Sequence, residues 1–116
     1  MYQLTIVFNK NELKKRGVSE DKYMNKIREY YNTHDVTEVK HNVFETTGKH
    51  AAVSLILPII DLTNEEFEFI YLLDKCEAIL GEEIDDIIED TFWWYKEQGY
   101  KVGNKETILY QSWVDV

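Results

Sequence analysis

Apolar side chains occupy every second position at the start of the chain: Tyr2, Leu4, Ile6 and Phe8. Alternation with a period of two is typical of a strand that buries one face. We therefore predict a first strand over residues 2–8. Residues 9–17 are polar and basic, and we interpret them as a connection.

The next apolar positions recur with the period of a helix. Ser19 is a suitable N-cap, and Glu20 and Asp21 would lie in the first turn, where the helix dipole favours negative charge. The predicted buried face has Met24 at its edge and consists of Tyr23, Ile27, Tyr30 and Tyr31. This helix should end near residues 32–34.

Residues 35–60 are typical of a β-hairpin. A three-residue loop that ends at Gly48 would place this glycine in the left-handed conformation. It would also set Val43 opposite Ala51, so that apolar residues of both strands share one face. Pro58 should then lie at the end of the second strand, where its missing N–H costs nothing.

A second helix is predicted after Thr63, which forms a capping-box pair with Glu66. The helical stripe that follows consists of Phe69, Leu72, Leu73, Cys76, Ile79 and Leu80. Residues 66–73 also alternate as a strand does, so both structures stay open there. The capping box and the length of the stripe favour the helix, which Gly81 should end or kink.

Residues 82–95 carry the densest charge of the chain. Wound as a helix, they place Ile84, Ile87, Ile88, Thr91, Phe92 and Tyr95 on one face. The remaining surface holds six carboxylates, from Glu82, Glu83, Asp85, Asp86, Glu89 and Asp90. Trp93 falls within this acidic arc and Glu97 follows one turn later. The pattern leaves open whether Trp93 is exposed or packs under a hairpin at residues 100–105.

Gly99 is a natural end for the last helix. A turn at Gly103 and Asn104 then predicts a short hairpin that leads into a final strand over residues 105–114. Its inward face is undecided, because Ile108, Tyr110 and Val114 compete with Leu109 and Trp113.

The predicted order of elements is βαββααβ, in a single α+β domain that covers residues 1–116. With the two later helical segments counted as one crossover broken near Gly81, this order matches the split βαβ pattern of ferredoxin-like folds. Such a fold has a four-stranded antiparallel sheet with helices packed on one face. Right-handed crossovers would place the first and third strands at its centre.

Charge narrows the classes of partner. The chain has a net charge of −9, and residues 61–90 contain twelve acidic residues against Lys75 alone. Such a surface repels nucleic acid and anionic membranes, and it attracts basic protein surfaces. No apolar run is long enough to span a bilayer, no signal-peptide pattern is present, and one cysteine excludes an internal disulfide. We therefore expect a cytoplasmic protein.

No catalytic, cofactor or metal motif stands out. His34, His41 and His50 lack the spacing of zinc ligands. Cys76 lies on an apolar stripe without a neighbouring base, which indicates a packed thiol. The carboxylates of residues 82–90 point away from the apolar stripe, whereas the ligands of carboxylate metal bundles point into the core. We expect no enzyme activity, no cofactor and no bound metal.

The sequence therefore predicts a small acidic binding protein that presents the helix of residues 82–97 to a basic protein surface and inhibits or modulates it. Carboxylates at helical spacing can imitate phosphates, so a nucleic-acid-binding enzyme is a suitable target. Counter-defence inhibitors of phages or mobile elements and immunity-type proteins have this character. The predicted partner-binding residues are Glu82, Glu83, Asp85, Asp86, Glu89, Asp90, Trp93 and Glu97.

The alternative is a homo-oligomeric ligand-binding or regulatory domain. It would use the open face of the sheet as a dimer interface or ligand platform. The residues predicted on that face are Gln3, Thr5, Val7, Phe44, Ala52, Ser54 and Ile56.

Overall fold

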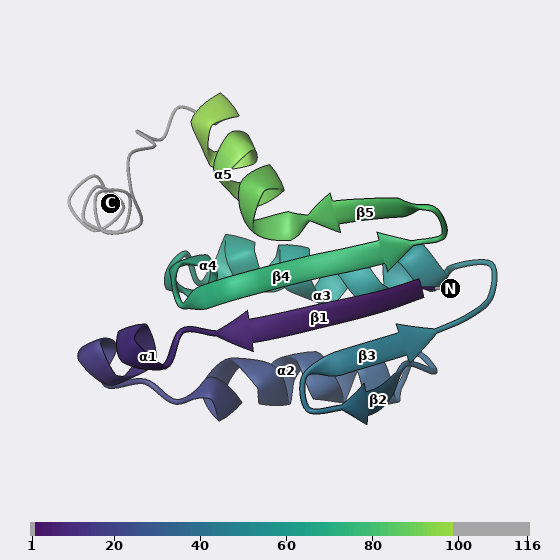
Figure 1. The fold of residues 1–116 in the computed structure, drawn as a ribbon, viewed down its shortest axis with the longest axis horizontal. Coiled ribbons are helices and arrows are strands. Elements are labelled where there is room, and N and C mark those ends of the chain that lie inside the picture. Colours follow the sequence, from purple (N-terminus) through teal and green to yellow (C-terminus); the bar gives the residue numbers. More distant parts are fainter. Residues whose placement is uncertain (1, 99–116) are drawn as a thin grey trace.

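A single antiparallel sheet organises the fold (Figure 1). The structure is a computed structural model, and it describes residues 2–98. Among these residues, five strands pair in the order β2-β3-β1-β4-β5. Their bounds are β1 (Tyr2–Phe8), β2 (Thr37–Lys40), β3 (Val43–Thr46), β4 (Leu73–Leu80) and β5 (Glu83–Asp86). The outermost strands, β2 and β5, have four residues each.

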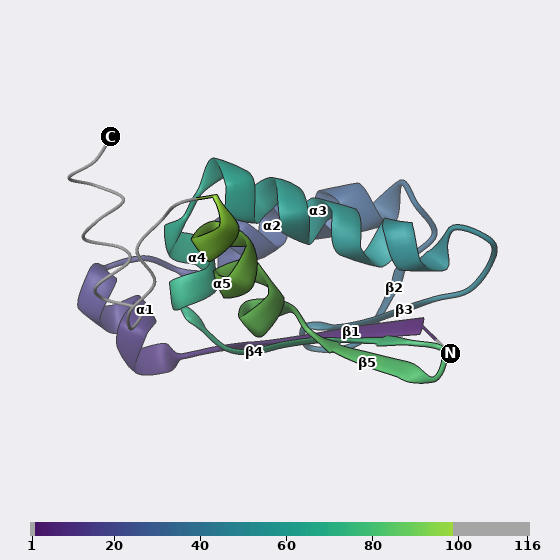
Figure 2. The ribbon, with the colours of Figure 1, turned by 90° about the horizontal axis from the view of Figure 1, so that it is seen from above.

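Helices cover one face of this sheet and leave the other face bare (Figure 2). The described helices are α1 (Lys10–Arg16), α2 (Glu20–Asn32), α3 (Ala51–Glu65), α4 (Glu68–Tyr71) and α5 (Ile87–Glu97). Helices α2 and α3 form most of the cover, and α1 lies beyond the end of β1. The predicted α+β class, with an antiparallel sheet and helices on one face, is confirmed, but the sheet has five strands instead of four.

Strand β1 agrees with the prediction and forms the centre of the sheet. Leu4, Ile6 and Phe8 are buried beneath the helices, whereas Val7 is exposed on the bare face. Leu4 pairs with a residue of β3 on one side and of β4 on the other. The alternation of the sequence therefore correctly identifies the inward face of β1.

The first long helix, α2, also agrees with the prediction. It follows Ser19 and buries Tyr23, Met24, Ile27 and Tyr31. Tyr30 is only half-buried, and its ring stacks on His34 with the centroids 3.9 Å apart. The segment before α2, predicted as a connection, contains the helix α1, which Gly17 ends in the left-handed conformation with a φ of 65°.

The predicted hairpin of residues 35–60 is wrong in its register and in its second strand. The turn between β2 and β3 lies at His41 and Asn42, and Asn42 adopts the left-handed conformation with a φ of 58°. Asn is among the residues that tolerate this conformation best. Its backbone N–H also donates to the Glu38 carboxylate at 2.8 Å, which stabilises the turn.

Residues 51–65, predicted partly as a strand that ends at Pro58, form the helix α3 with Pro58 in its interior. Leu55, Ile59 and Leu62 are buried, but Val53, Leu57 and Ile60 are exposed on the outer side. A helix that is apolar nearly all round gives no clear period, so the sequence does not distinguish it from a strand. Gly48 has a positive φ of 107°, in the loop before this helix.

The helix predicted from Thr63 to Leu80 is also wrong. Thr63 lies inside α3, where its hydroxyl donates to the Ile60 carbonyl at 2.9 Å, so it caps no helix. After the short helix α4, the chain becomes β4, which pairs with β1 along its length. This pairing between distant segments overrides the local helical pattern. Gly81, with a φ of 71°, lies in the turn from β4 to β5 instead of ending a helix.

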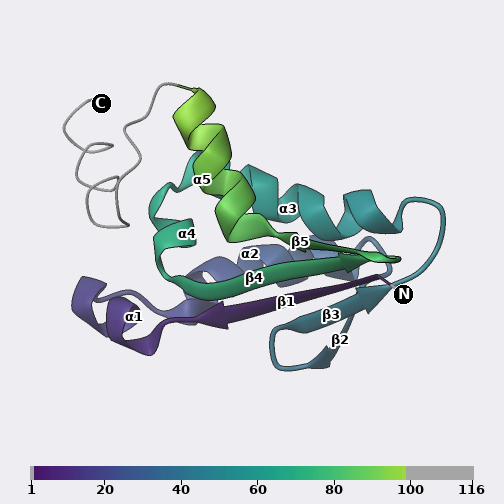
Figure 3. The same cartoon turned by 45° about the horizontal axis from the view of Figure 1, so that its top comes forward.

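Two buried tyrosines fix helices in place. The Tyr31 hydroxyl of α2 donates to the Leu55 carbonyl of α3 at 2.6 Å. The Tyr95 hydroxyl of α5 donates to the Thr63 carbonyl at 2.9 Å. Figure 3 shows the result, with α5 beside α3 and α4. The Tyr95 bond holds α5 against the C-terminal end of α3, which positions the surface described next.

No helix within residues 2–98 combines the length and apolarity needed to cross a membrane. The hairpin and final strand predicted for residues 100–114 lie outside the described residues.

Candidate functional site

The predicted helix of residues 82–97 is wrong in its first part. Glu82 lies in the turn after β4, and Glu83, Asp85 and Asp86 belong to β5. Helix α5 begins at Ile87 and carries the remaining predicted site residues, Glu89, Asp90, Trp93 and Glu97. The acidic residues therefore lie on a hairpin edge and on the helix that follows it, not on one helix face.

Asp86 is the reason for this break. Its carboxylate accepts hydrogen bonds from the backbone N–H groups of Ile88 at 3.0 Å and Glu89 at 3.2 Å, so it is the N-cap of α5. The residues before it extend, and Ile84 pairs with Ile79 of β4. Ile84, predicted on the buried face of a helix, is 66% exposed on this strand.

The acidic surface, which we define as the carboxylates of these two elements together with Trp93, is open to solvent. Asp85 is half-buried, and the other carboxylates are exposed. Within residues 2–98, none of these carboxylates forms an ion pair. The acidic surface comprises Glu82, Glu83, Asp85, Asp86, Glu89, Asp90, Trp93 and Glu97.

Like charges affect one another at this surface. The pKa of Asp90 is raised above its ordinary value, first by partial burial and then by the negative charges of Asp85, Asp86 and Glu89. A raised carboxylate pKa means that the folded protein disfavours the charged form. A cation placed here would relieve that cost.

Trp93 is 63% exposed, and the adjacent Trp94 is 41% exposed. The hairpin that could have covered Trp93 falls on residues outside the described part of the chain. Aromatic side chains are enriched at protein–protein interfaces relative to the rest of the surface, and charged residues there lie mainly at the rim.

Next to the acidic surface lies a groove of about 360 Å³ between α3 and the β5–α5 segment. Its lining residues are Ile56, Ile60, Thr63, Asn64, Asp85, Ile87, Asp90, Thr91 and Trp94. Sequence reasoning missed this groove, because it interpreted residues 51–60 as a strand. The usable signal was the spacing of Ile56 and Ile60, which are four residues apart, as neighbours on one side of a helix are.

The three histidines do not converge. All are exposed, His34 stacks on Tyr30, and His41 Nε2 lies 2.7 Å from the Glu20 carboxylate. In the described part of the chain, no cluster of three or more His, Cys, Asp or Glu side chains could hold a metal ion. Cys76 is 1% exposed on the inward side of β4, and burial raises the pKa of its thiol. The predicted burial of Cys76 is confirmed, although on a strand and not on a helix.

No family model, curated protein or solved structure matches this chain. We therefore infer the candidate site from its geometry and charge.

Proposed function

We propose that the protein is a non-enzymatic, cytoplasmic binding protein that docks its acidic surface onto a basic protein and so inhibits or modulates that protein. One observation carries this proposal: the segment from Glu82 to Glu97 carries seven carboxylates and the exposed Trp93, and none of these carboxylates forms an ion pair within residues 2–98. Asp86 stabilises the fold as the N-cap of α5, but the other six carboxylates have no cationic partner within residues 2–98.

The two kinds of residue have different roles in this proposal. Trp93 is the anchor, because interface energy concentrates in a few aromatic and arginine side chains that lose contact with water on binding. The carboxylates of the acidic surface steer a basic partner toward the anchor and mainly raise the association rate. A nucleic-acid-binding enzyme remains the target that we favour, because its binding site is basic by necessity.

The structure leaves fewer grounds for proposing that the acidic surface imitates nucleic acid. The carboxylates do not form a row along a single helix, so the comparison with phosphates rests on charge density, not on helical spacing. A counter-defence inhibitor of a phage or mobile element, or an immunity-type protein, would act through such a surface, and both belong to this proposal.

The test is capture of a partner from the native host, followed by measurement of its affinity across a salt series. We expect Trp93→Ala to weaken binding by about 2 kcal/mol or more, roughly thirtyfold in Kd. A triple variant with Gln at Glu82, Glu83 and Glu89 should slow association and flatten the salt dependence.

A matched triple variant at Glu29, Asp35 and Glu45, with Gln, Asn and Gln, removes the same charge from other parts of the molecule. It should leave association and its salt dependence nearly unchanged. If Trp93→Ala and the acidic-surface triple variant both bind as the parent protein does, the acidic surface is only solvated and the proposal is wrong.

A homo-oligomer that uses the bare sheet face is the second candidate. Exposed Val7 and Ile84 and half-buried Ile79 support it, because these apolar side chains lie on that face. The predicted residue set needs correction, since Phe44 is buried beneath the helices. Three other residues of the set, Ala52, Ser54 and Ile56, belong to α3. A dimer that resists high salt and is dissociated by Val7→Lys would favour this candidate over the first.

We also propose that β1 to β4 with α2 and α3 form a ferredoxin-like unit to which β5 is added. The position of β1 between β3 and β4, antiparallel to both, supports this relation. It carries no function with it.

A further inference from the structure

The groove between α3 and α5 has two apolar walls that face solvent. Ile60 of α3 is 47% exposed and Trp94 of α5 is 41% exposed, and both line the groove. Ile56 and Ile87 line it as well, and they are more deeply buried. Tyr95 bonds to Thr63 from the buried side and so holds the two helices at this separation. An open apolar groove of this kind on a folded surface is typical of a binding site.

Two carboxylates interrupt this apolar lining. Asp85 enters from β5 and Asp90 from α5, and no cation within residues 2–98 pairs with either of them. The remaining polar groups of the lining, on Thr63, Asn64 and Thr91, are uncharged. The groove thus combines apolar walls with negative charge and lacks any positive charge in its described lining. Its complement is a ligand that is both apolar and cationic.

We propose that this groove receives an amphipathic basic segment of the partner protein, with an apolar side chain between Ile60 and Trp94 and a Lys or Arg against Asp85 and Asp90. This inference rests on the proposed function, since it names the part of the basic partner that engages the surface. It adds a second contact beside the Trp93 anchor. It also gives the interface an apolar centre, which charge alone does not provide.

The size of the groove agrees with this occupant. A volume of about 360 Å³ lies near the lower end of the range of ligand pockets, about 300–1,000 Å³. It therefore accepts one or two side chains and not a whole element. Recognition of an amphipathic segment by apolar anchors in a groove is a recurrent mode of peptide binding.

Charge argues against a second copy of this chain as the occupant. Each copy has a net charge of −9, so association through this groove would bring two acidic surfaces together. The negative field of this surface attracts a basic segment, whereas it repels a second copy of the chain.

The test uses the full-length protein and three synthetic helical peptides of equal length. The first has Leu on one face and Lys on the other. The second replaces Leu by Ser, and the third replaces Lys by Glu. We expect the Leu/Lys peptide to bind, the Ser/Lys peptide to bind at least tenfold more weakly, and the Leu/Glu peptide not to bind. Equal binding of the Leu/Lys and Ser/Lys peptides would overturn the inference, and so would equal binding of the Leu/Lys and Leu/Glu peptides.

Groove variants locate the site. Ile60→Ser and, separately, Asp90→Asn should each weaken binding of the Leu/Lys peptide about tenfold. Val53→Ser is the matched control, because Val53 lies on the same helix, is 60% exposed and does not line the groove. It should leave affinity unchanged. Asp90→Asn is nearly isosteric, so it keeps the test decisive if Ile60→Ser destabilises α3.

The two proposals can fail separately. If Ile60→Ser and Asp90→Asn bind the Leu/Lys peptide normally but the Gln triple variant at Glu82, Glu83 and Glu89 does not, the acidic surface stands and the groove inference is wrong. If the groove variants lose peptide binding while the captured partner binds both that triple variant and Trp93→Ala as it binds the parent protein, the groove stands and the proposed function is wrong. Deletion of residues 99–116 that raises peptide affinity tenfold, or a dimer that Ile60→Ser dissociates, would identify a different occupant and overturn the inference.

Discussion

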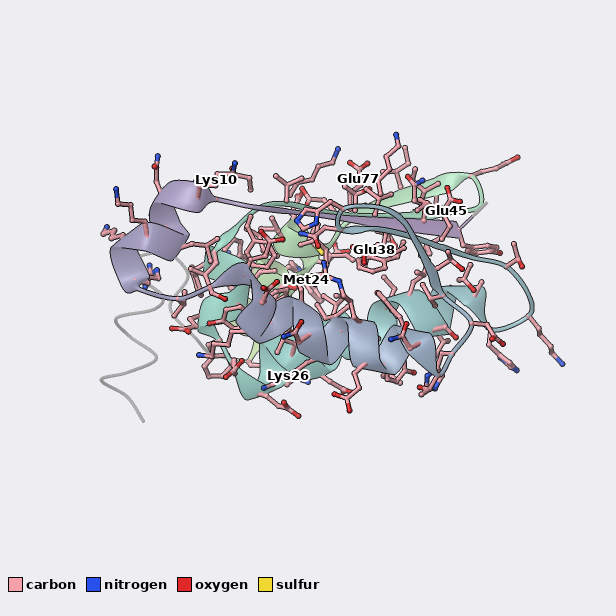
Figure 4. The ribbon with its side chains drawn as sticks, turned by 90° about the horizontal axis from the view of Figure 1, so that it is seen from below. Lys10, Met24, Lys26, Glu38, Glu45 and Glu77 are labelled. Carbon is pink, nitrogen blue, oxygen red and sulfur yellow. The ribbon has the colours of Figure 1, made fainter. Side chains whose placement is uncertain are left out.

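The surfaces around α2 and α5 use charge in opposite ways. On α2, Arg28 lies 3.0 Å from Glu38 and 3.9 Å from Asp21, and Lys26 lies 3.7 Å from Glu66. Figure 4 shows Lys26 on the outer side of α2 and Glu38 nearer the sheet. Around α5, the carboxylates of the acidic surface have no such partners within residues 2–98.

The paired charges of α2 connect elements. Arg28 donates to the Glu38 carboxylate through Nε and Nη2, and Nη2 also lies 2.9 Å from the Asn42 side-chain oxygen. Glu20 accepts from the Asn42 amide at 2.6 Å. This network joins α2 to the turn between β2 and β3. Charge therefore connects elements at α2, whereas at α5 it stabilises the fold only through Asp86, the N-cap, among the described carboxylates of the acidic surface.

The aromatic side chains of α2 and α5 also differ. Tyr31 of α2 is 1% exposed and tilts against Phe44, with the ring centroids 4.8 Å apart. Tyr23 of α2 is fully buried, packs against Phe69 and donates to the Glu68 carboxylate. Trp93 and Trp94 of α5 are exposed. Helix α2 thus buries two of its three aromatic side chains in the core, whereas α5 buries Tyr95 but presents both tryptophans to solvent.

The largest effect that we expect is a difference in stability between substitutions of a buried and an exposed aromatic residue. Tyr31→Ala should lower the free energy of unfolding by about 3–5 kcal/mol, because it leaves a cavity and removes the bond to Leu55. Trp93→Ala should change it by less than about 0.5 kcal/mol. Urea unfolding followed by circular dichroism measures both. A loss of several kcal/mol for Trp93→Ala would mean that Trp93 is packed, and the comparison would fail.

The ion pairs of α2 give the next largest effect. Arg28→Ala should cost about 0.5–1.5 kcal/mol, because it removes the hydrogen bonds that Arg28 donates to the Glu38 carboxylate and to the Asn42 side chain. Glu89→Gln on α5 is the contrasting substitution, and we expect no loss of stability. A double-mutant cycle between Arg28 and Glu38 measures the coupling. A coupling energy near zero would show that the pair is only a surface contact.

Acidification should affect stability through Glu38. The hydrogen bond from Arg28 is the main cause that lowers the pKa of Glu38 below its ordinary value of 4.5. A carboxylate with a lowered pKa in the folded state stabilises the fold above about pH 4.5, and this contribution is lost as the pH falls through the folded-state pKa. In urea titrations below pH 5, Glu38→Gln should therefore lose less stability on acidification than the parent protein. An identical pH profile for the two proteins would contradict this.

The smallest effect that we expect is a gain in stability, from a substitution on α5. Because the pKa of Asp90 is raised, its charged form costs stability above that pKa, and the cost disappears as the pH falls below the ordinary value of 3.8. Asp90→Asn should therefore raise the free energy of unfolding at pH 7 by a few tenths of a kcal/mol, roughly the size of one like-charge pair. A difference measurement by thermal unfolding at low salt would detect it. Destabilisation instead would indicate that the Asp90 carboxylate has a structural partner.

Local pattern predicts the parts of this fold that have a clear period. Strand β1 alternates over seven residues and α2 keeps one apolar stripe, so both are identified correctly. Helix α3 fails because apolar residues surround it. The prediction for strand β4 is wrong because its helical spacing is outweighed by pairing with β1, whose paired residues lie 65 to 78 positions earlier in the chain, from Phe8 with Leu73 to Tyr2 with Leu80. Neither fact is visible in a short window of sequence.

The candidate site also has one part that the sequence predicts, the acidic surface, and one part that it does not, the groove. The many acidic residues of the segment 82–97 predict that it lies on the surface, because charged side chains are rarely buried without partners. The break of the predicted helix had a local signal, because Asp86 followed by Glu89 three residues later resembles a capping box. For the groove, the spacing of Ile56 and Ile60 indicated only one wall, because Ile60 and Trp94 become neighbours only when α3 and α5 pack together.

The carboxylates of β5 have one further consequence. This strand ends the described sheet and has only four residues, three of which are acidic: Glu83, Asp85 and Asp86. An unpaired edge invites a strand from another molecule, and charge on a short edge discourages it. The residues that we propose as the docking site of a basic partner thus also discourage edge-to-edge pairing. If the proposed partner neutralises this edge, it has to cover the edge as well, and its release would then expose an edge that only these charges protect.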